Sequence, residues 1–279
     1  MGVSERVSTP ESDVEQNEKL WMMLLVPRIA AVSYLNTIPF IYGIEHADNP
    51  LRAELLLTPP ATCAQNFLEG KADIALLPAA VVPQLTNYEL LPDYCLGAVG
   101  PVRTVVIASH QPLAEVKRIF LDPHSRTSVQ LTGWLAANKW HITPEWYALE
   151  DYAQVAHPEK GDAFLLIGDK VFGYEGQFPF LYDLAEEWQS ATGLPFAFAV
   201  WVARKGTPYE VTDALTEALT FGVEHTYEAV LHYGFDKKPY DAYDYLTRNI
   251  DFLFDNEKHR ALQKFWDSGV KVTPRVNPG

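Results

Sequence analysis

From residue 28 onward, short apolar runs alternate with segments of helical periodicity, and this alternation limits the chain to few fold classes. The run from Arg28 to Ser33 predicts a strand. Asn36 and Thr37 come just before Pro39, so side chains able to cap are followed by a proline in the first turn, which predicts a helix to about His46. Repeated along the chain, this order is typical of βα units and predicts an α/β protein with mainly parallel sheets.

The same periodicities place the remaining elements. Further strands are predicted over residues 51–57, 72–77, 102–109, 118–121, 163–167 and 196–203. Further helices are predicted over residues 58–70, 127–138, 181–192, 207–231 and 255–268. Thr127 with Gln130, and Thr207 with Glu210, fit capping boxes at two of the helix starts, and Gly70 is placed to end the first of these helices.

Length and charge narrow the function. A chain of 279 residues suggests about two domains, with one large α/β unit as the alternative. Acidic residues outnumber Lys and Arg by 36 to 22, which argues against a nucleic-acid partner because phosphate binding needs a basic face.

The apolar run at residues 20–26 is too short for a membrane span, which needs about 20 apolar residues. Residues 1–19 are acidic where a secretory signal would be basic. The sequence therefore predicts a cytoplasmic protein that does not enter a membrane, with residues 1–23 as a disordered tail or upstream extension.

No metal or cofactor site is predicted. Cys63 and Cys95 are far apart in the sequence and lack CxxC spacing, so we expect both to be small buried residues. The eight histidines are scattered singly, and His124 reads as a solvated loop residue. Motifs for nucleotides, for zinc hydrolases and for α/β-hydrolases are absent from the sequence.

Small polar residues gather instead where predicted strands pass into helices, at residues 33–37, 100–104, 125–128 and 168–169. In open α/β sheets, ligands bind beyond the carboxyl ends of strands, where helix N-termini offer free N–H groups. Ser125, Arg126, Thr127 and Ser128 together offer hydroxyls, a guanidinium and backbone donors, which suits a carboxylate. The alternative for this segment is helix capping beside a solvated arginine.

Five segments, in order, resemble one enzyme family. They are VSYLNTIPF at 32–40, ADIALLPAA at 72–80, GPVRTVVIAS at 100–109, DPHSRTS at 122–128 and EEWQSATGLPFAFAVW at 186–201. Their order and spacing are similar to those of the chorismate dehydratases of the futalosine route to menaquinone. The resemblance runs from about residue 28 to about residue 269.

The resemblance implies a two-lobed fold of the type II periplasmic-binding-protein class, with a ligand cleft between the lobes. Residues 24–106 and 199–279 would form one lobe, and residues 107–198 the other. The implied reaction removes water from chorismate to give 3-[(1-carboxyvinyl)oxy]benzoate and requires no metal or redox cofactor. The implied partner is thus a small dicarboxylate substrate, chorismate. The sequence does not indicate an oligomeric state.

The resemblance also implies site residues. Asn36 is the expected catalytic residue, and a helix N-cap is its alternative role. The expected substrate-binding residues are Ser33, Tyr34, Thr37, Arg103, Thr104, Ser125, Arg126, Thr127, Ser128, Gly168 and Asp169. Apart from Asp169, these motifs contain no evident general base, so either a carboxylate of chorismate itself or a base elsewhere in the chain takes the proton.

Two other functions stay open. A solute-binding receptor would share the fold and the cleft, although such proteins are normally exported. The dihydroxynaphthoate synthase of the same pathway is also cleft-based, but its family opens with a Ser-Pro-Cys-Pro-Asn-Asp type of segment where this chain has residues 33–37 as Ser-Tyr-Leu-Asn-Thr.

Overall fold

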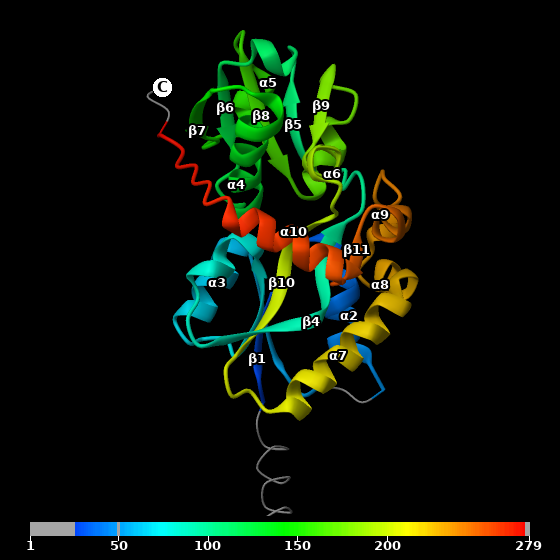
Figure 1. The fold of residues 1–279 in the computed structure, drawn as a ribbon. Coiled ribbons are helices and arrows are strands. Elements are labelled where there is room, and N and C mark those ends of the chain that lie inside the picture. The colour runs from blue at the N-terminus through cyan, green and yellow to red at the C-terminus, as the bar shows by residue number, and fades with distance from the viewer. Residues whose placement is uncertain (1–25, 49–50, 277–279) are drawn as a thin grey trace, which may run out of the picture.

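The chain folds around two β-sheets that lie one above the other in Figure 1, each flanked by helices. The computed structural model describes residues 26–48 and 51–276. The predicted tail at residues 1–23 lies outside these described residues. Within them, no helix is both long enough and apolar enough to cross a membrane.

The first sheet has six strands in the order β11-β4-β10-β3-β1-β2. Its strands are β1 (Arg28–Val32), β2 (Glu54–Thr58), β3 (Ile74–Pro78), β4 (Tyr88–Ala98), β10 (Phe196–Arg204) and β11 (Asp251–Leu253). Its helices are α2 (Ile38–His46), α3 (Pro60–Leu68), α7 (Tyr209–Glu224), α8 (Thr226–His232) and α9 (Ala242–Arg248). The βα units predicted from residue 28 onward are present, and β1 pairs in parallel with both β2 and β3.

The second sheet has five strands in the order β7-β6-β8-β5-β9. Its strands are β5 (Val105–Ser109), β6 (Arg118–Leu121), β7 (Glu145–Ala148), β8 (Asp162–Ile167) and β9 (Phe180–Asp183). Its helices are α4 (Arg126–Leu135), which continues in a π-helical turn to Trp140, α5 (Ala153–Ala156) and α6 (Leu184–Thr192).

The prediction of mainly parallel sheets is wrong. Of the nine strand pairings among the described residues, five are antiparallel. Strand β10 enters the first sheet between β3 and β4 and runs antiparallel to both. It follows β9 and α6 of the second sheet and is not connected by a βα crossover to a neighbouring strand of its own sheet, so this connection does not impose a parallel direction on it.

Several predicted elements begin or end elsewhere, and for three of them the structure shows the local reason. The strand predicted from Val102 starts at Val105, because Arg103 has a φ of 63°, which lies outside the extended region. The helix predicted over 181–192 is strand β9 followed by α6, whose first turn is capped by the Asp183 carboxylate. The long helix predicted over 207–231 breaks at His225 into α7 and α8.

The capping box predicted for Thr207 and Glu210 is also absent. Pro208 takes the N-cap position of α7, with no side-chain cap bond. The Thr207 hydroxyl donates to the Arg204 carbonyl instead. The helix therefore begins next to the predicted place, but by another local device.

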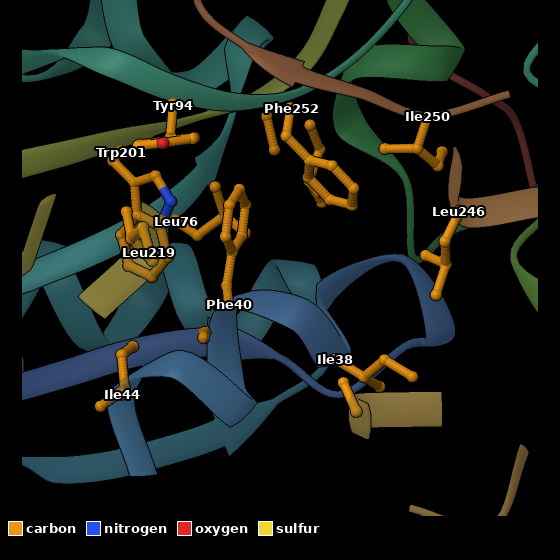
Figure 2. Packing of buried hydrophobic residues seen from close by; sticks show 14 of the residues in the cluster. Ile38, Phe40, Ile44, Leu76, Tyr94, Trp201, Leu219, Leu246, Ile250 and Phe252 are labelled. Carbon is orange, nitrogen blue, oxygen red and sulfur yellow. The ribbon is translucent and has the colours of Figure 1, made fainter. Parts of the chain in front are cut away.

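Helix α2 is fixed to the first sheet by an aromatic cluster around Phe40 (Figure 2). The Phe40 ring meets Phe252, Trp201 and Tyr94 edge-on, with ring centroids 5.1, 5.8 and 6.0 Å away. All four side chains are buried. Such pairs add about 0.5–1.5 kcal/mol each beyond the area that they bury. The start of α2, and with it the turn that precedes α2, is thereby held in place.

Helices α2 and α7 approach each other so closely that both need glycine at the crossing. A Cβ on Gly43 would lie 1.9 Å from the Ala218 carbonyl oxygen, and one on Gly222 would lie 1.9 Å from the Pro39 carbonyl oxygen. Neither distance is sterically allowed, so any larger residue at these positions would push the helices apart.

Helix α10 (Asn256–Asp267) packs against the cores of both sheets, and in Figure 1 it crosses the level where they meet. Phe265 belongs to the core cluster of the second sheet, and Leu262 to a cluster of the first. The chain after α10 then runs along the second sheet. There the Val272 amide donates to the Gln130 side chain at 2.7 Å, and the Ala148 amide donates to the Arg275 carbonyl at 2.9 Å.

The prediction for the cysteines is confirmed. Cys63 and Cys95 are buried and unpaired. Burial raises the pKa of the Cys63 thiol to about 12 and also raises the pKa of Cys95. Both are therefore protonated packing residues at neutral pH.

Candidate active site

A pocket opens between the two sheets, at the ends of β1, β3 and β8 and at the N-terminus of α4. It is lined by Val32, Tyr34, Asn36, Pro60, Pro78, Leu96, Gly97, Val102, Thr104, Val105, Ser125, Arg126, Thr127, Ser128, Ile167, Gly168, Phe198, Ala199 and Ile250. The polar junctions predicted at residues 33–37, 100–104, 125–128 and 168–169 each contribute at least one residue to this lining. The walls are otherwise mostly apolar.

Asn36 lies in a 3-10 turn, residues Leu35–Thr37, between β1 and α2. The hydroxyl of Thr37 closes this turn by donating to the Tyr34 carbonyl at 2.7 Å. The Asn36 Oδ1 atom is buried, lies in a pocket-lining residue and has no hydrogen-bond partner among the described residues. A buried acceptor left without a donor costs about 1–3 kcal/mol, so this oxygen is suited to accept from a bound ligand.

The alternative role of Asn36 as a helix N-cap is wrong. The N-cap of the 3-10 turn is Tyr34, and the N-cap of α2 is Thr37, which makes no side-chain cap bond. The sequence pattern was ambiguous because Asn is favoured at caps, whereas here the extra 3-10 turn moves the helix start past it.

The N-terminus of α4 faces the same pocket. Ser125 caps this helix by accepting from the Ser128 amide at 3.1 Å. The capping box predicted for Thr127 and Gln130 is therefore wrong. Thr127 instead donates to the Phe198 carbonyl at 3.0 Å, which ties α4 to β10. The amides of Arg126 and Thr127 lie in the first turn of α4, where backbone N–H groups have no acceptor within the helix and can bind an anion.

Among the described residues that line this pocket, Arg126 has the single charged side chain. It is exposed, and within the described part of the chain its guanidinium pairs with no carboxylate. Arg28, Arg103 and Arg118, by contrast, are each paired with an acidic side chain. The pocket thus combines one unpaired cation with a helix N-terminus in a protein whose net charge is −14.

Two further predicted residues, Thr104 and Gly168, also line the pocket. The Thr104 hydroxyl is buried and lies 2.7 Å from the Tyr245 hydroxyl. Gly168 donates its amide to the Thr104 carbonyl at 2.8 Å and has a φ of 75°, which favours glycine. A Cβ at Gly168 would also come within 3.9 Å of the Tyr34 ring. Gly168 therefore sets the turn beside Tyr34.

Four predicted site residues lie outside the lining. Ser33 is exposed, and Thr37 is the buried residue that closes the Asn36 turn. Arg103 turns to Glu175, at 2.8 Å. Asp169 accepts from the Leu35 amide at 3.2 Å and thereby joins β8 of one sheet to the Asn36 turn of the other. Burial raises the pKa of the Asp169 carboxyl.

One polar cluster beside the pocket was not predicted. The Asp122 carboxylate is fully buried and accepts from Lys170 Nζ at 2.8 Å, from the Tyr152 hydroxyl and from the His124 amide. Burial and, to a lesser extent, the negative charges of Asp122 and Asp169 raise the pKa of Tyr34. The sequence signal for Asp122 was its position directly after an apolar run and before Pro123, whereas Tyr152 and Lys170 carry no local signal.

Solved structures similar to this chain share its fold. Protein AF1704 from Archaeoglobus fulgidus has a TM-score of 0.68 at 19% identity, covering 86% of this chain and 95% of that chain. The Candida albicans CA3427 gene product, described as exhibiting the generic periplasmic binding protein structural fold, has a TM-score of 0.60 at 13% identity, covering 91% of this chain and 99% of that chain. The predicted two-lobed fold of the periplasmic-binding-protein class is confirmed.

Sequence comparison adds the family. Over 214 residues the chain is 26% identical to a Thermus thermophilus protein named chorismate dehydratase. The matched region covers 66% of this chain and 78% of that protein. Residues 27–271 match the protein family described as menaquinone biosynthesis. Since this match takes in both sheets and the pocket between them, the chain belongs to the menaquinone biosynthesis family.

Proposed function

We propose that this protein removes water from chorismate to give 3-[(1-carboxyvinyl)oxy]benzoate. The observation that carries the proposal is the pairing, across one pocket, of the unpartnered Asn36 amide oxygen with the free cationic end of α4. Chorismate offers a hydroxyl that can donate to the first and carboxylates that can bind to the second. The Thermus thermophilus relative supports the choice of substrate.

In the proposed reaction, a C–H bond and the C–O bond to the hydroxyl break on neighbouring ring carbons. The electron pair of the C–H bond becomes the third double bond of the ring, and the proton and hydroxide leave as water. Arg126 and the first amides of α4 hold a carboxylate, and charge-assisted bonds of this kind contribute about 1.5–3 kcal/mol each. Asn36 accepts from the hydroxyl and orients it for departure.

The proton acceptor is proposed to be a carboxylate of the substrate itself. Among the described residues that line the pocket there is no Asp, Glu or His. Asp169 is the nearest predicted candidate, but its carboxylate accepts from the Leu35 amide. In this proposal the protein holds the reactive conformer in the pocket between the two sheets.

The test is to incubate the purified protein with chorismate alone and to follow the aromatic enol ether by chromatography and ultraviolet absorbance. The expected result is product formation far above spontaneous decay of chorismate, lost in N36A. If chorismate raises the melting temperature without turning over, the protein is a small-carboxylate binder and the proposal is wrong. If chorismate neither binds nor reacts, a sister reaction of the same pathway takes its place.

A further inference from the structure

Away from the pocket, the ends of two helices bring together three potential metal ligands. Glu45 and His46 lie in the last turn of α2, and His232 is the last residue of α8. One ligand atom from each lies within 4.8 Å of the other two, and all three side chains are exposed. In sequence these histidines are 186 positions apart, which is why they read as single residues.

The surroundings of the three side chains favour a cation. The Tyr233 hydroxyl donates to Glu45 Oε2 at 2.5 Å and so fixes the carboxylate. The Tyr42 ring lies 4.5 Å from the His46 ring and 5.7 Å from the His232 ring, between centroids, so one aromatic side chain lies beside both imidazoles. Both helices also end here, and the negative ends of two helix dipoles attract positive charge.

We propose that Glu45, His46 and His232 form a surface site for one divalent transition-metal ion of the zinc class. Two imidazoles and one carboxylate suit Zn²⁺, Ni²⁺ or Cu²⁺, whereas Mg²⁺ and Ca²⁺ prefer oxygen ligands alone. Because the ligands are exposed, water completes the coordination. Ligand atoms in a tetrahedral zinc site lie about 3.3 Å apart at the usual bond lengths, so small rotamer changes close the site.

The site would clamp the C-terminal ends of α2 and α8 together. It does not rest on the proposed dehydratase function, because its residues lie at the far end of α2 from the Asn36 turn. The hydrogen bond from Tyr233 would serve the metal indirectly by orienting Glu45.

The test is isothermal titration of the tag-free full chain with Zn²⁺, with Mg²⁺ as the comparison ion. The expected result is one Zn²⁺ per chain and no Mg²⁺ binding. H46Q and H232Q should each weaken Zn²⁺ binding by more than about tenfold, and Y233F by up to about tenfold. H157Q, which changes an exposed histidine outside the cluster, is the matched control and should bind like the original protein.

A spectroscopic readout keeps the test independent of stability. Electron paramagnetic resonance of the protein with one equivalent of Cu²⁺ should show coupling to two imidazole nitrogens, and to one in H46Q or H232Q. Zn²⁺ affinity that is unchanged in both histidine variants, or a Cu²⁺ spectrum without imidazole nitrogen, would overturn the proposal. N36A should bind Zn²⁺ normally whether or not it turns over chorismate, so the two proposals fail separately.

Discussion

At the scale of single residues, Asn36 and Thr37 share one turn but differ in what their side chains do. The Asn36 amide oxygen has no partner among the described residues, whereas the Thr37 hydroxyl lies within hydrogen-bonding distance of the Val32 carbonyl at the end of β1 and of the Tyr34 carbonyl. Loss of the Asn36 amide should therefore weaken interactions with a bound ligand, and loss of the Thr37 hydroxyl should lower the stability of the fold. This difference yields a matched pair of variants.

We expect N36A to lower kcat for chorismate by about 10²-fold or more, as loss of an oriented polar group in an active site does. Its melting temperature should not fall, because the variant removes a buried acceptor that lacks a donor. T37A should lose stability by about 1 kcal/mol along with activity. Steady-state kinetics and thermal melts on both variants check this. Equal losses of stability in the two would contradict the assigned role of Asn36.

For Arg126, the unpaired guanidinium predicts an effect on substrate binding. R126A should raise KM for chorismate roughly 10- to 100-fold, which corresponds to one lost charge-assisted bond. R260A is the control, because Arg260 is exposed on α10 and pairs with Glu257 only. An unchanged KM in R126A would show that the helix amides, and not the side chain, hold the anion.

The Asp122 cluster predicts coupling between two residues that are 48 positions apart. Lys170 forms an ion pair with the Asp122 carboxylate, which has no exposed surface. Each of D122N and K170M should therefore destabilise the protein, and the double variant should be less unstable than the sum by roughly 0.5–3 kcal/mol. Chemical denaturation of the four proteins measures this energy. Strict additivity would mean that Asp122 and Lys170 do not stabilise each other and would contradict this prediction.

At the scale of elements, the crossing of α2 and α7 predicts where the fold tolerates no added atom. G222A should destabilise the protein by about 1–3 kcal/mol or more, because its Cβ would meet the Pro39 carbonyl. G173A is the control, since a Cβ there would meet nothing within 4 Å. Thermal melts compare the two. A melting temperature of G222A equal to that of G173A would mean that the two helices can separate freely.

Elements with clear periodicity were predictable from sequence, and those built from tertiary contacts were not. The helix at the C-terminal end was placed almost to the residue, because Asp255 caps it and its apolar stripe is regular. Strand β4 was missed, since Pro92 and Asp93 interrupt its pattern. The structure accommodates them at a register irregularity opposite β10, which no local pattern reveals.

The candidate site divides in the same way. Residues in strand-to-helix junctions were predictable because the carboxyl ends of strands gather at one edge. Lys170 and Tyr152 were not, because only the fold brings them to Asp122. The role of Thr127 as a tie to β10, in place of a cap, likewise depends on a strand 71 residues away.

At the scale of the whole molecule, the bond from the Leu35 amide to Asp169 joins the turn after β1 of the first sheet to the turn after β8 of the second. Because burial raises the pKa of this carboxyl, the folded state holds more protons there than the unfolded state. The contribution of Asp169 to stability is therefore greatest below the unfolded pKa and falls as pH rises through the folded pKa. D169N keeps an acceptor for Leu35 and lacks this titration.

We expect the unfolding free energy of the original protein to fall relative to that of D169N as pH rises from about 4 to 7. Urea denaturation across this range measures it, with D236N at an exposed position as the control. A difference that does not vary with pH would mean that the Asp169 carboxyl titrates alike in both states.

The chain passes from one sheet to the other three times: from β4 to β5, from α6 to β10, and from β11 through α10 to the segment bonded to β7. Two rigid bodies joined at two points can still swing about the line between those points. A third attachment off that line removes this freedom. Wide opening of the pocket must therefore bend α10 or break the backbone hydrogen bonds between Arg275 and β7. Access for a ligand is thus controlled by the C-terminal segment, at a distance from the pocket.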